Sequence, residues 1–117
     1  MTRVDSSVAG SPLVGTAGTF FSTNPAHLSD VVAEVSLASP QQLVEAFRAA
    51  RQAQPAWGAT PAPVRGQVIA KIGRLVEANF EALAQLVTRE VGKPIAEAVA
   101  ALDRVLGRLS PLRKASS

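Results

Sequence analysis

The sequence predicts a mostly α-helical domain that begins with a short β-hairpin. Two β-prone runs, residues 19–23 and 31–37, flank a turn signal. Downstream, apolar residues recur at helical spacing, and prolines and a glycine stand where helices should start and stop. The expected organisation is a flexible arm over residues 1–18, a β-hairpin over 19–38, about four helices over 39–110 and a frayed basic and serine-rich tail over 111–117.

Composition excludes several kinds of chemistry. A chain of 117 residues suits one domain with a modest core, and with only 4% aromatic residues that core must be aliphatic. The sequence has no cysteine, which excludes disulfides, thiolate metal sites and a thiol nucleophile. Its single histidine, His27, makes a histidine metal site or a serine–histidine relay hard to build.

The net charge of +3 does not indicate a nucleic-acid partner. The excess comes from Arg104, Arg108, Arg113 and Lys114, whereas the chain through Asp103 is nearly neutral. Such a tail lacks the basic face with interleaved aromatics that base stacking needs. No apolar run approaches the roughly 18–20 residues of a membrane span, and no secretory signal opens the chain, so we expect a cytoplasmic location.

The first 18 residues are rich in small and polar types, which predicts a flexible arm because they bury little apolar area. Gly10 and Gly15 are spaced like the glycines of a phosphate loop. No Lys-Ser/Thr pair follows Gly15, no strand is expected before the run and no helix after it. A flexible tail is the favoured interpretation.

In the hairpin, Asn24-Pro25 initiates a loop expected to extend to Asp30, which leaves His27 on the surface in solvent. A lone hairpin is marginally stable in water, so it must pack on something else.

The first helix has a strong start signal. Ser39 can cap the free amides, Pro40 suits the first helical position, and Gln42 fills the reciprocal place of a capping box. The helix should end near Gln54 because Pro55 disfavours helical geometry at the residue before it.

Three more helices follow. Thr60 as a cap and Pro61 at the first position predict a second helix that ends near Ala78, with Asn79 as the break. The third helix should extend to Val91.

Gly92 is the expected left-handed terminator of the third helix. Lys93 suits the negative end of the helix dipole there, and Pro94 restarts a fourth helix.

Charged and aromatic residues of the helices have simple structural interpretations. Glu77 and Glu81 lie four residues apart and Glu90 lies further along, and these carboxylates are expected to form a solvated edge rather than a catalytic pair. The cations Lys71, Arg74 and Lys93 lie outside any glycine-rich loop, which favours solvated charge over anion binding. Trp57 is expected to pack the first helix onto the second.

Several short motifs follow one another along the chain at consistent spacing. They are Asn24-Pro25 before an alternating strand, Ala49-Ala50-Arg51, Trp57-x-x-x-Pro61-x-x-x-Arg65, Glu90-x-Gly92-Lys93-Pro94 and Glu97-Ala98. This succession resembles the N-terminal segment of the NAD(P)-dependent aldehyde dehydrogenase family, over roughly residues 19–98. In the family, this segment is a hairpin with helices packed around the dinucleotide-binding domain of an α/β fold.

The resemblance implies a parent enzyme that oxidises an aldehyde to an acid, or to acyl-CoA in one branch. A cysteine attacks the aldehyde, hydride passes to the nicotinamide of NAD or NADP, and a glutamate activates the hydrolytic water. An asparagine and a backbone amide hold the oxyanion, and a lysine and a glycine-rich loop hold the cofactor. None of those motifs occurs here, so we assign this chain no catalytic, cofactor-binding or metal residue.

The family pattern is expected to stop after Ala98, where Ala101-Leu102 replaces a glutamate-valine pair. This favours a truncated or frameshifted fragment that is marginally stable or aggregating and not catalytic alone. The alternative is a small helical interaction module that docks on a full-length aldehyde dehydrogenase subunit or on itself through Ile95, Leu102, Val105 and Leu109. A basic-tailed nucleic-acid binder is a third possibility.

Overall fold

A computed structural model describes residues 1–109, which fall into two compact units. Unit 1 is Met1–Ala59 and unit 2 is Thr60–Ser117, the latter described to Leu109. The predicted tail over 111–117 and the predicted end of the helical segment at residue 110 lie outside the described residues.

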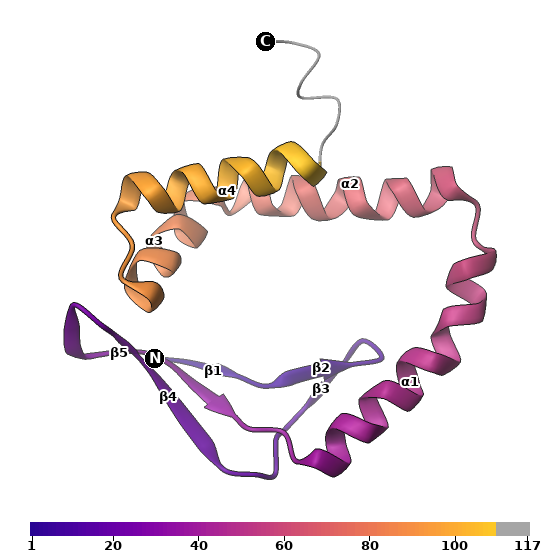
Figure 1. Ribbon diagram of the computed structural model, residues 1–117, viewed down its shortest axis with the longest axis horizontal. Helices are drawn as coiled ribbons and strands as arrows, with labels where there is room; N and C mark the ends of the chain where they lie inside the picture. The colour runs from indigo at the N-terminus through magenta and orange to yellow at the C-terminus, as the bar shows by residue number, and fades with distance from the viewer. Residues whose placement is uncertain (110–117) are drawn as a thin grey trace. The chain divides into compact units, whose positions relative to one another are not determined.

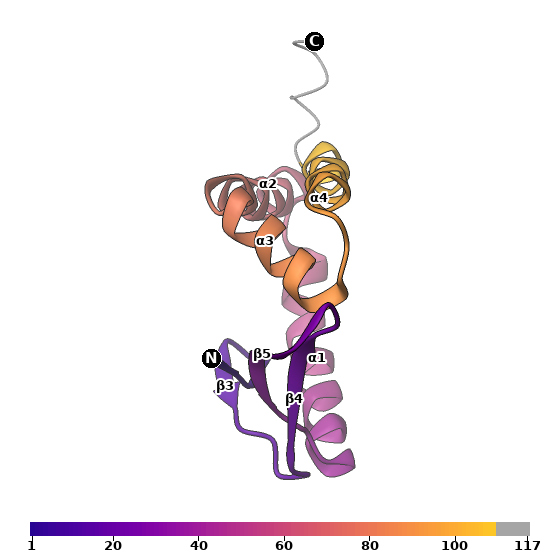
Figure 2. The same ribbon diagram turned by 90° about the vertical axis from the view of Figure 1, so that its left-hand side faces the viewer.

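Unit 1 contains the predicted hairpin as part of a three-stranded sheet with the order β1-β5-β4 (Figures 1 and 2). The central strand β5, His27–Ser36, pairs antiparallel with β4, Thr19–Asn24, and parallel with β1, Thr2–Val4. Val32 and Ala33, on opposite faces of β5, are both buried. The hairpin prediction is therefore confirmed, and the sheet gains a strand that the sequence did not predict.

The loop of the hairpin is tighter than predicted. Only Pro25 and Ala26 separate the strands, so β5 begins at His27 instead of Val31. The Asn24 side chain explains the tight turn: its Oδ1 accepts the Ala26 amide at 3.0 Å, and its Nδ2 donates to Asp30 at 3.1 Å. Register shifts on both sides of Thr23, which lies opposite Val31, accommodate the additional residues of β5.

The flexible arm predicted for residues 1–18 is wrong, because ordered strands occupy this segment. Besides β1, strand β2, Ser6–Val8, pairs antiparallel with β3, Ser11–Leu13. The turn between them holds Ala9 at φ 52° and Gly10 at φ 79°, the paired positive φ values of a tight hairpin turn. The composition of residues 1–18 predicted too little order, because backbone pairing and polar side chains hold this segment in place instead of apolar burial.

Helix α1, Pro40–Ala59, starts as predicted. The Ser39 hydroxyl accepts the Gln42 amide at 3.2 Å, and the Gln42 side chain accepts the Ser39 amide at 2.9 Å, which completes a capping box. The predicted end near Gln54 is wrong, because the helix continues through Pro55. Pro55 loses its own helical hydrogen bond and its ring crowds the carbonyl four residues earlier, but the helix-favouring alanines before it and at position 56 oppose a break.

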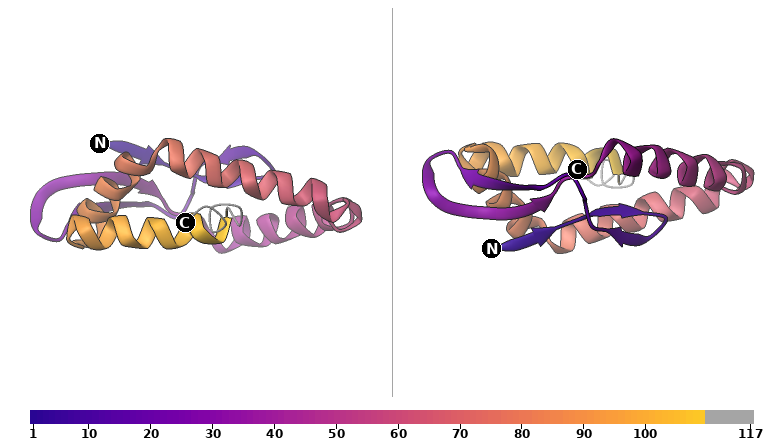
Figure 3. Two further views of the ribbon diagram at one scale, coloured as in Figure 1. Left: turned by 90° about the horizontal axis from the view of Figure 1, so that it is seen from above. Right: turned by 90° about the horizontal axis from the view of Figure 1, so that it is seen from below.

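Unit 2 consists of α2, Ala62–Ala78, α3, Phe80–Val91, and α4, Ile95–Leu109, and α4 packs against both other helices (Figure 3). The predicted break at Asn79 is confirmed: its side-chain Nδ2 donates to the Leu75 carbonyl at 2.8 Å. The predicted start of α2 is one residue early. Pro61, extended at ψ 141°, is itself the N-cap, and its carbonyl accepts the Arg65 amide at 3.1 Å.

Both units have small cores. The buried apolar residues among those described are Val32, Ala33, Ala84, Ala98 and Leu106. Large apolar side chains stay exposed instead; Phe47, for example, is 70% exposed and Leu28 is 75% exposed. Among the helices of residues 1–109, none combines the length and apolar character needed to cross a membrane.

Gly15 offers a direct test of how closely residues 1–18 pack on the end of β5. A Cβ at Gly15 would overlap the Leu37 carbonyl and lie 2.8 Å from the Ala38 nitrogen. We expect Gly15→Ala to lower the free energy of unfolding of unit 1 by about 2 kcal/mol or more, because neither backbone group can move away cheaply. Urea unfolding followed by circular dichroism measures the change.

Gly58→Ala is the matched control, since a Cβ there meets only the Gln54 side chain at 3.5 Å, an ordinary contact. In α1 this control should be neutral or stabilising. Equal effects of the two substitutions would contradict the predicted close approach at Gly15.

Candidate functional site

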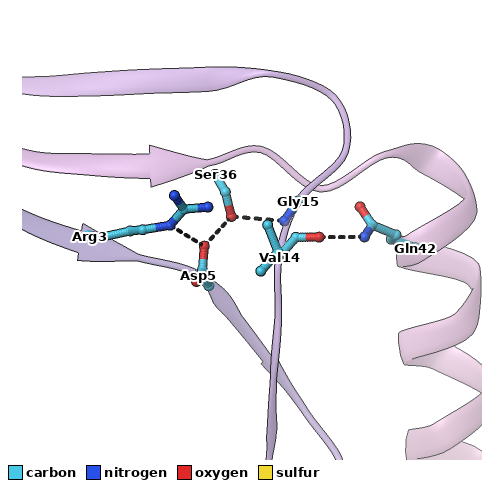
Figure 4. Close-up of polar contacts among 6 residues, drawn as sticks. All are labelled: Arg3, Asp5, Val14, Gly15, Ser36 and Gln42. Atoms are coloured by element: carbon cyan, nitrogen blue, oxygen red, sulfur yellow. Dashed lines mark hydrogen bonds and ion pairs between the residues drawn. The ribbon is translucent and has the colours of Figure 1, made fainter.

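A cluster of hydrogen bonds in unit 1 joins the N-terminal strands, the end of β5 and the start of α1 (Figure 4). We call it the polar junction. Its side chains are Asp5, Ser36 and Gln42, and its backbone groups belong to Val14, Gly15, Thr16 and Ser39. Segments from 21 to 31 residues apart in the sequence meet here.

Ser36 forms one half of the polar junction. Its hydroxyl donates to Asp5 Oδ1 at 2.6 Å and accepts the Gly15 amide at 2.8 Å, and its residue is buried at the end of β5. Arg3 Nε lies 3.4 Å from the same carboxylate oxygen. The Ser36 hydrogen bond, and secondarily Arg3, hold the pKa of Asp5 below its usual value although partial burial opposes them.

Gln42 forms the other half. Its Oε1 accepts the Ser39 amide at 2.9 Å, the Thr16 amide at 3.1 Å and the Thr16 hydroxyl at 3.2 Å. Its Nε2 donates to the Val14 carbonyl at 2.8 Å (Figure 4). The buried Gln42 side chain thus provides hydrogen-bond partners both for a backbone amide at the start of α1 and for backbone groups of the residues that follow β3.

The capping pattern identified Gln42 from the sequence, but only as a partner of Ser39. Its bonds to Thr16 and Val14 span 26 and 28 residues, and no local pattern encodes such a distance. Asp5 and Ser36 were missed for the same reason, since each is an ordinary polar residue in its own segment.

The polar junction is suited to holding structure and not to a reaction. Its one carboxylate, Asp5, has a lowered pKa and is therefore a weak general base, and the Ser36 hydroxyl beside it is buried with both its donor and its acceptor engaged. The only histidine lies elsewhere, exposed in β5, with Nε2 2.9 Å from the Ser29 hydroxyl. Within residues 1–109, no group of three or more His, Cys, Asp or Glu side chains is placed to bind a metal ion.

The motif residues singled out from the sequence divide between the two units. Unit 1 contains Asn24 and Pro25 at the hairpin turn and Trp57 on α1, 45% exposed. Packing of Trp57 on the second helix stays a prediction. Unit 2 contains the rest, at the start of α2 and between α3 and α4: Pro61, Arg65, Glu90, Gly92, Lys93 and Pro94.

The turn between α3 and α4 has the predicted geometry. Gly92 is left-handed, at φ 75° and ψ 17°, and its amide donates to the Thr88 carbonyl at 3.0 Å. The Pro94 carbonyl then accepts the amides of Glu97 at 3.0 Å and Ala98 at 3.1 Å, which begins α4. The motif residues at this turn therefore stop one helix and start the next.

The charged residues considered for catalysis or anion binding are all exposed, on helices or, for Lys93, in the turn between α3 and α4. These are Lys71, Arg74, Glu77, Glu81, Glu90 and Lys93. Exposed groups of this kind keep the solvation that a general acid, a general base or an anion site must partly exclude.

The docking face suggested for α4 stays a prediction. Ile95 and Val105 are exposed, but Leu102 and Leu109 are half-buried, and a Cβ at Gly73 of α2 would lie 3.2 Å from the Leu109 Cβ. The stripe that α4 buries against its neighbours includes Ala98 and Leu106. Two of the four residues of the suggested face are thus partly covered within unit 2.

Comparison with solved structures gives the class of protein first. The chain is similar to an NAD-dependent aldehyde dehydrogenase from Sinorhizobium meliloti, with 29% identity and a TM-score of 0.87 over 93% of this chain and 22% of that one. It is also similar to aldehyde dehydrogenase 21 from Physcomitrella patens in complex with the product succinate, with 30% identity and a TM-score of 0.85 over 92% of this chain and 22% of that one. The fold is thus that of part of an aldehyde-oxidising dehydrogenase.

The sequence then fixes the family. The model of the aldehyde dehydrogenase family matches residues 14–115, and the chain belongs to that family. Malonate-semialdehyde dehydrogenase 2 from Geobacillus kaustophilus is 41% identical over 81 residues, which cover 69% of this chain and 16% of that enzyme. The chain therefore spans about one-sixth of the length of this relative.

The expected departure from the family after Ala98 is wrong, since the family match extends to residue 115. The replaced pair, Ala101-Leu102, lies inside α4, where both residues are half-buried.

We predict that Gln42→Glu weakens the polar junction. The new carboxylate keeps an acceptor for Ser39 and Thr16 but places a second oxygen against the Val14 carbonyl, where Nε2 donated. The free energy of unfolding of unit 1 should fall by about 2 kcal/mol. Denaturant unfolding at neutral pH measures it.

The neighbouring, exposed Gln41→Glu is the control and should change stability by less than about 0.5 kcal/mol. If Gln42→Glu were as stable as the wild type, the bond to Val14 would contribute nothing and the predicted role of the amide would be wrong.

We predict that Gly92→Ala destabilises unit 2 by about 1–2 kcal/mol, because alanine resists the left-handed conformation. Gly107→Ala, with open space around the added Cβ in the interior of α4, should be neutral or stabilising. Thermal unfolding of both variants measures the difference. A loss of stability in Gly107→Ala as large as that in Gly92→Ala would contradict this account of the turn.

Proposed function

We propose that this chain is the N-terminal structural segment of an NAD(P)-dependent aldehyde dehydrogenase whose parent activity is oxidation of an aldehyde to a carboxylic acid. Family membership and the short span relative to its relatives support the proposal. The observation that carries it is the exposure of large apolar side chains in both units. They include Phe20, Phe21, Leu28 and Phe47 in unit 1 and Leu75, Val91 and Ile95 in unit 2.

Exposure on this scale indicates faces shaped to pack on more protein. Complete burial of one such side chain contributes about 1.5–3 kcal/mol, and a whole domain is stable by only about 5–15 kcal/mol. Leaving several of them in water therefore forfeits an amount comparable to the stability of the domain. The occupant we propose is the remainder of the dehydrogenase fold, in the same polypeptide or in a related subunit.

The chain itself is proposed to be catalytically inactive. Family members use a cysteine nucleophile, and none of the 117 residues is cysteine. Its own residues contribute by fixing a hairpin and helices in place, as the polar junction and the Gly92 turn do.

The residues present do not fit a nucleotide site for NAD or NADP. In the only phosphate-loop-like run, Gly10 forms the β2–β3 turn, and the Gly15 and Thr16 amides already donate to Ser36 and Gln42. Amides engaged in this way are not available to cradle a phosphate. The cofactor of the parent enzyme is thus assigned to sequence outside this chain.

A chimera tests the proposal. Residues 1–109 replace the corresponding segment of the Geobacillus kaustophilus enzyme, and NADH formation is followed with malonate semialdehyde. If this chain has the family role, the chimera should fold and retain dehydrogenase activity within about tenfold of the parent enzyme, because the catalytic groups are unchanged.

The isolated chain, assayed beside the chimera, should form no NADH above the protein-free rate. A chimera containing Gly15→Ala is the control for correct folding of the inserted segment and should lose yield or thermal stability. A folded but inactive chimera would contradict the structural role, and NADH formation by the isolated chain would contradict its assignment as non-catalytic.

A further inference from the structure

Residues 1–16, which we call the N-terminal strap, are attached to the rest of unit 1 in an unusual way. No residue of the strap is buried. Strand β1 reaches only the edge of β5, where Thr2, Arg3 and Val4 lie opposite Ala33, Glu34 and Val35. Beyond this ladder, the strap is held by the hydrogen bonds of the polar junction.

The strap also packs loosely on α1. A cavity of about 230 Å³ separates Ser7, Val8 and Ala9 from the alanine face of the helix. Its helix side is formed by Ala46, Ala49, Ala50 and Ala53. Few apolar contacts are therefore lost if the strap moves away, which is the property of segments that open locally.

The hairpin does not depend on the strap in the same way. Strands β4 and β5 share a longer ladder, from Thr19 opposite Ser36 to Asn24 opposite His27. Its turn is closed by Asn24, and Val32 is buried. The hairpin has contacts of its own that persist when β1 leaves.

Asp5 is the charged group that joins the strap to β5. Its carboxylate accepts the buried Ser36 hydroxyl, and this fixes the Ser36 oxygen to accept the Gly15 amide from the other end of the strap. The charged groups on the paired strands are Arg3, beside the carboxylate, Glu34, opposite Arg3, and Asp30, bonded to Asn24. Loss of the Asp5 charge turns the charge-assisted hydrogen bond from Ser36 into a weaker neutral one, whereas the contact with Arg3 lies within the strap itself.

We propose that the N-terminal strap is a detachable element latched by the negative charge of Asp5, and that it opens as a unit when this carboxylate is protonated. The β4–β5 hairpin stays formed in the open state. Opening uncovers the edge of β5 from Ala33 to Val35, where β1 was paired.

The direction of the pH effect follows from the lowered pKa of Asp5. The latch is fully present above the ordinary aspartate pKa and is lost as the pH falls through the lower value of the folded protein. The strap should therefore open in acid and remain closed at neutral pH.

Hydrogen–deuterium exchange of the full chain, corrected for intrinsic rates at each pH, tests the latch. At neutral pH, Asp5→Asn should raise exchange of the strap amides about fivefold or more while the amides of residues 19–36 keep wild-type protection. The strap amides of the wild type should exchange this fast only at acidic pH. In Asp5→Asn their exchange, once corrected for intrinsic rates, should show no such increase as the pH falls. Glu45→Gln, an exposed carboxylate on α1, is the control and should behave as the wild type.

The proposal would be overturned if, at neutral pH, the strap amides of Asp5→Asn exchanged at the same rate as those of the wild type. It would also be overturned by simultaneous loss of protection by the strap and the hairpin, either in the variant or in acid-treated wild type, because the strap would then not be a separate unit. An increase in strap exchange at acidic pH that Asp5→Asn retained would assign the effect to another group and would also overturn the proposal.

Discussion

The buried amide of Gln42 is the interaction on which unit 1 depends. It completes the capping box with Ser39 at the start of α1, and it binds Thr16 and Val14 after β3. A side chain with both a carbonyl and an NH₂ group is needed, because the site presents donors on one side and a backbone carbonyl on the other. Ser36 links the end of β5 to Asp5 and Gly15. A few directional hydrogen bonds therefore position α1, the N-terminal strap and the sheet relative to one another.

Directional polar bonds are prominent because little apolar surface is buried within either unit. The buried apolar residues of the described chain are mostly small, whereas Phe47 and Leu28 lie largely in water. In a complete fold, the usual order is reversed, since apolar burial provides most of the stability and hydrogen bonds provide specificity. Membership of the aldehyde dehydrogenase family and the short span relative to its members support our proposal that the exposed apolar faces pack on another part of a dehydrogenase.

Short sequence patterns correctly predicted the helix ends that depend on interactions between neighbouring residues. The Ser39-Pro40 start, the Asn79 break and the left-handed Gly92 were all found in place, because each depends on residues within one turn of the helix. The predictions failed where a distant contact or a longer context mattered. Pro55 did not end α1, Asn24 tightened its own turn by reaching Asp30, and residues 1–18 became strands through pairing with β5 and bonds to Ser36 and Gln42.

The sequence by itself determined that four helices form, with the caps at Ser39, Asn79 and Gly92, and it determined the hairpin, the absence of a cysteine nucleophile and the family resemblance, because these are properties of residue type and short spacing. Only the tertiary structure decided that Asp5, Ser36 and Gln42 meet, that the strap joins the sheet, and which face of α4 is buried against α2 and α3. The physical reason is chain separation. Bonds between groups 21 to 31 residues apart require the loops between them to close, and no short-range pattern records that closure.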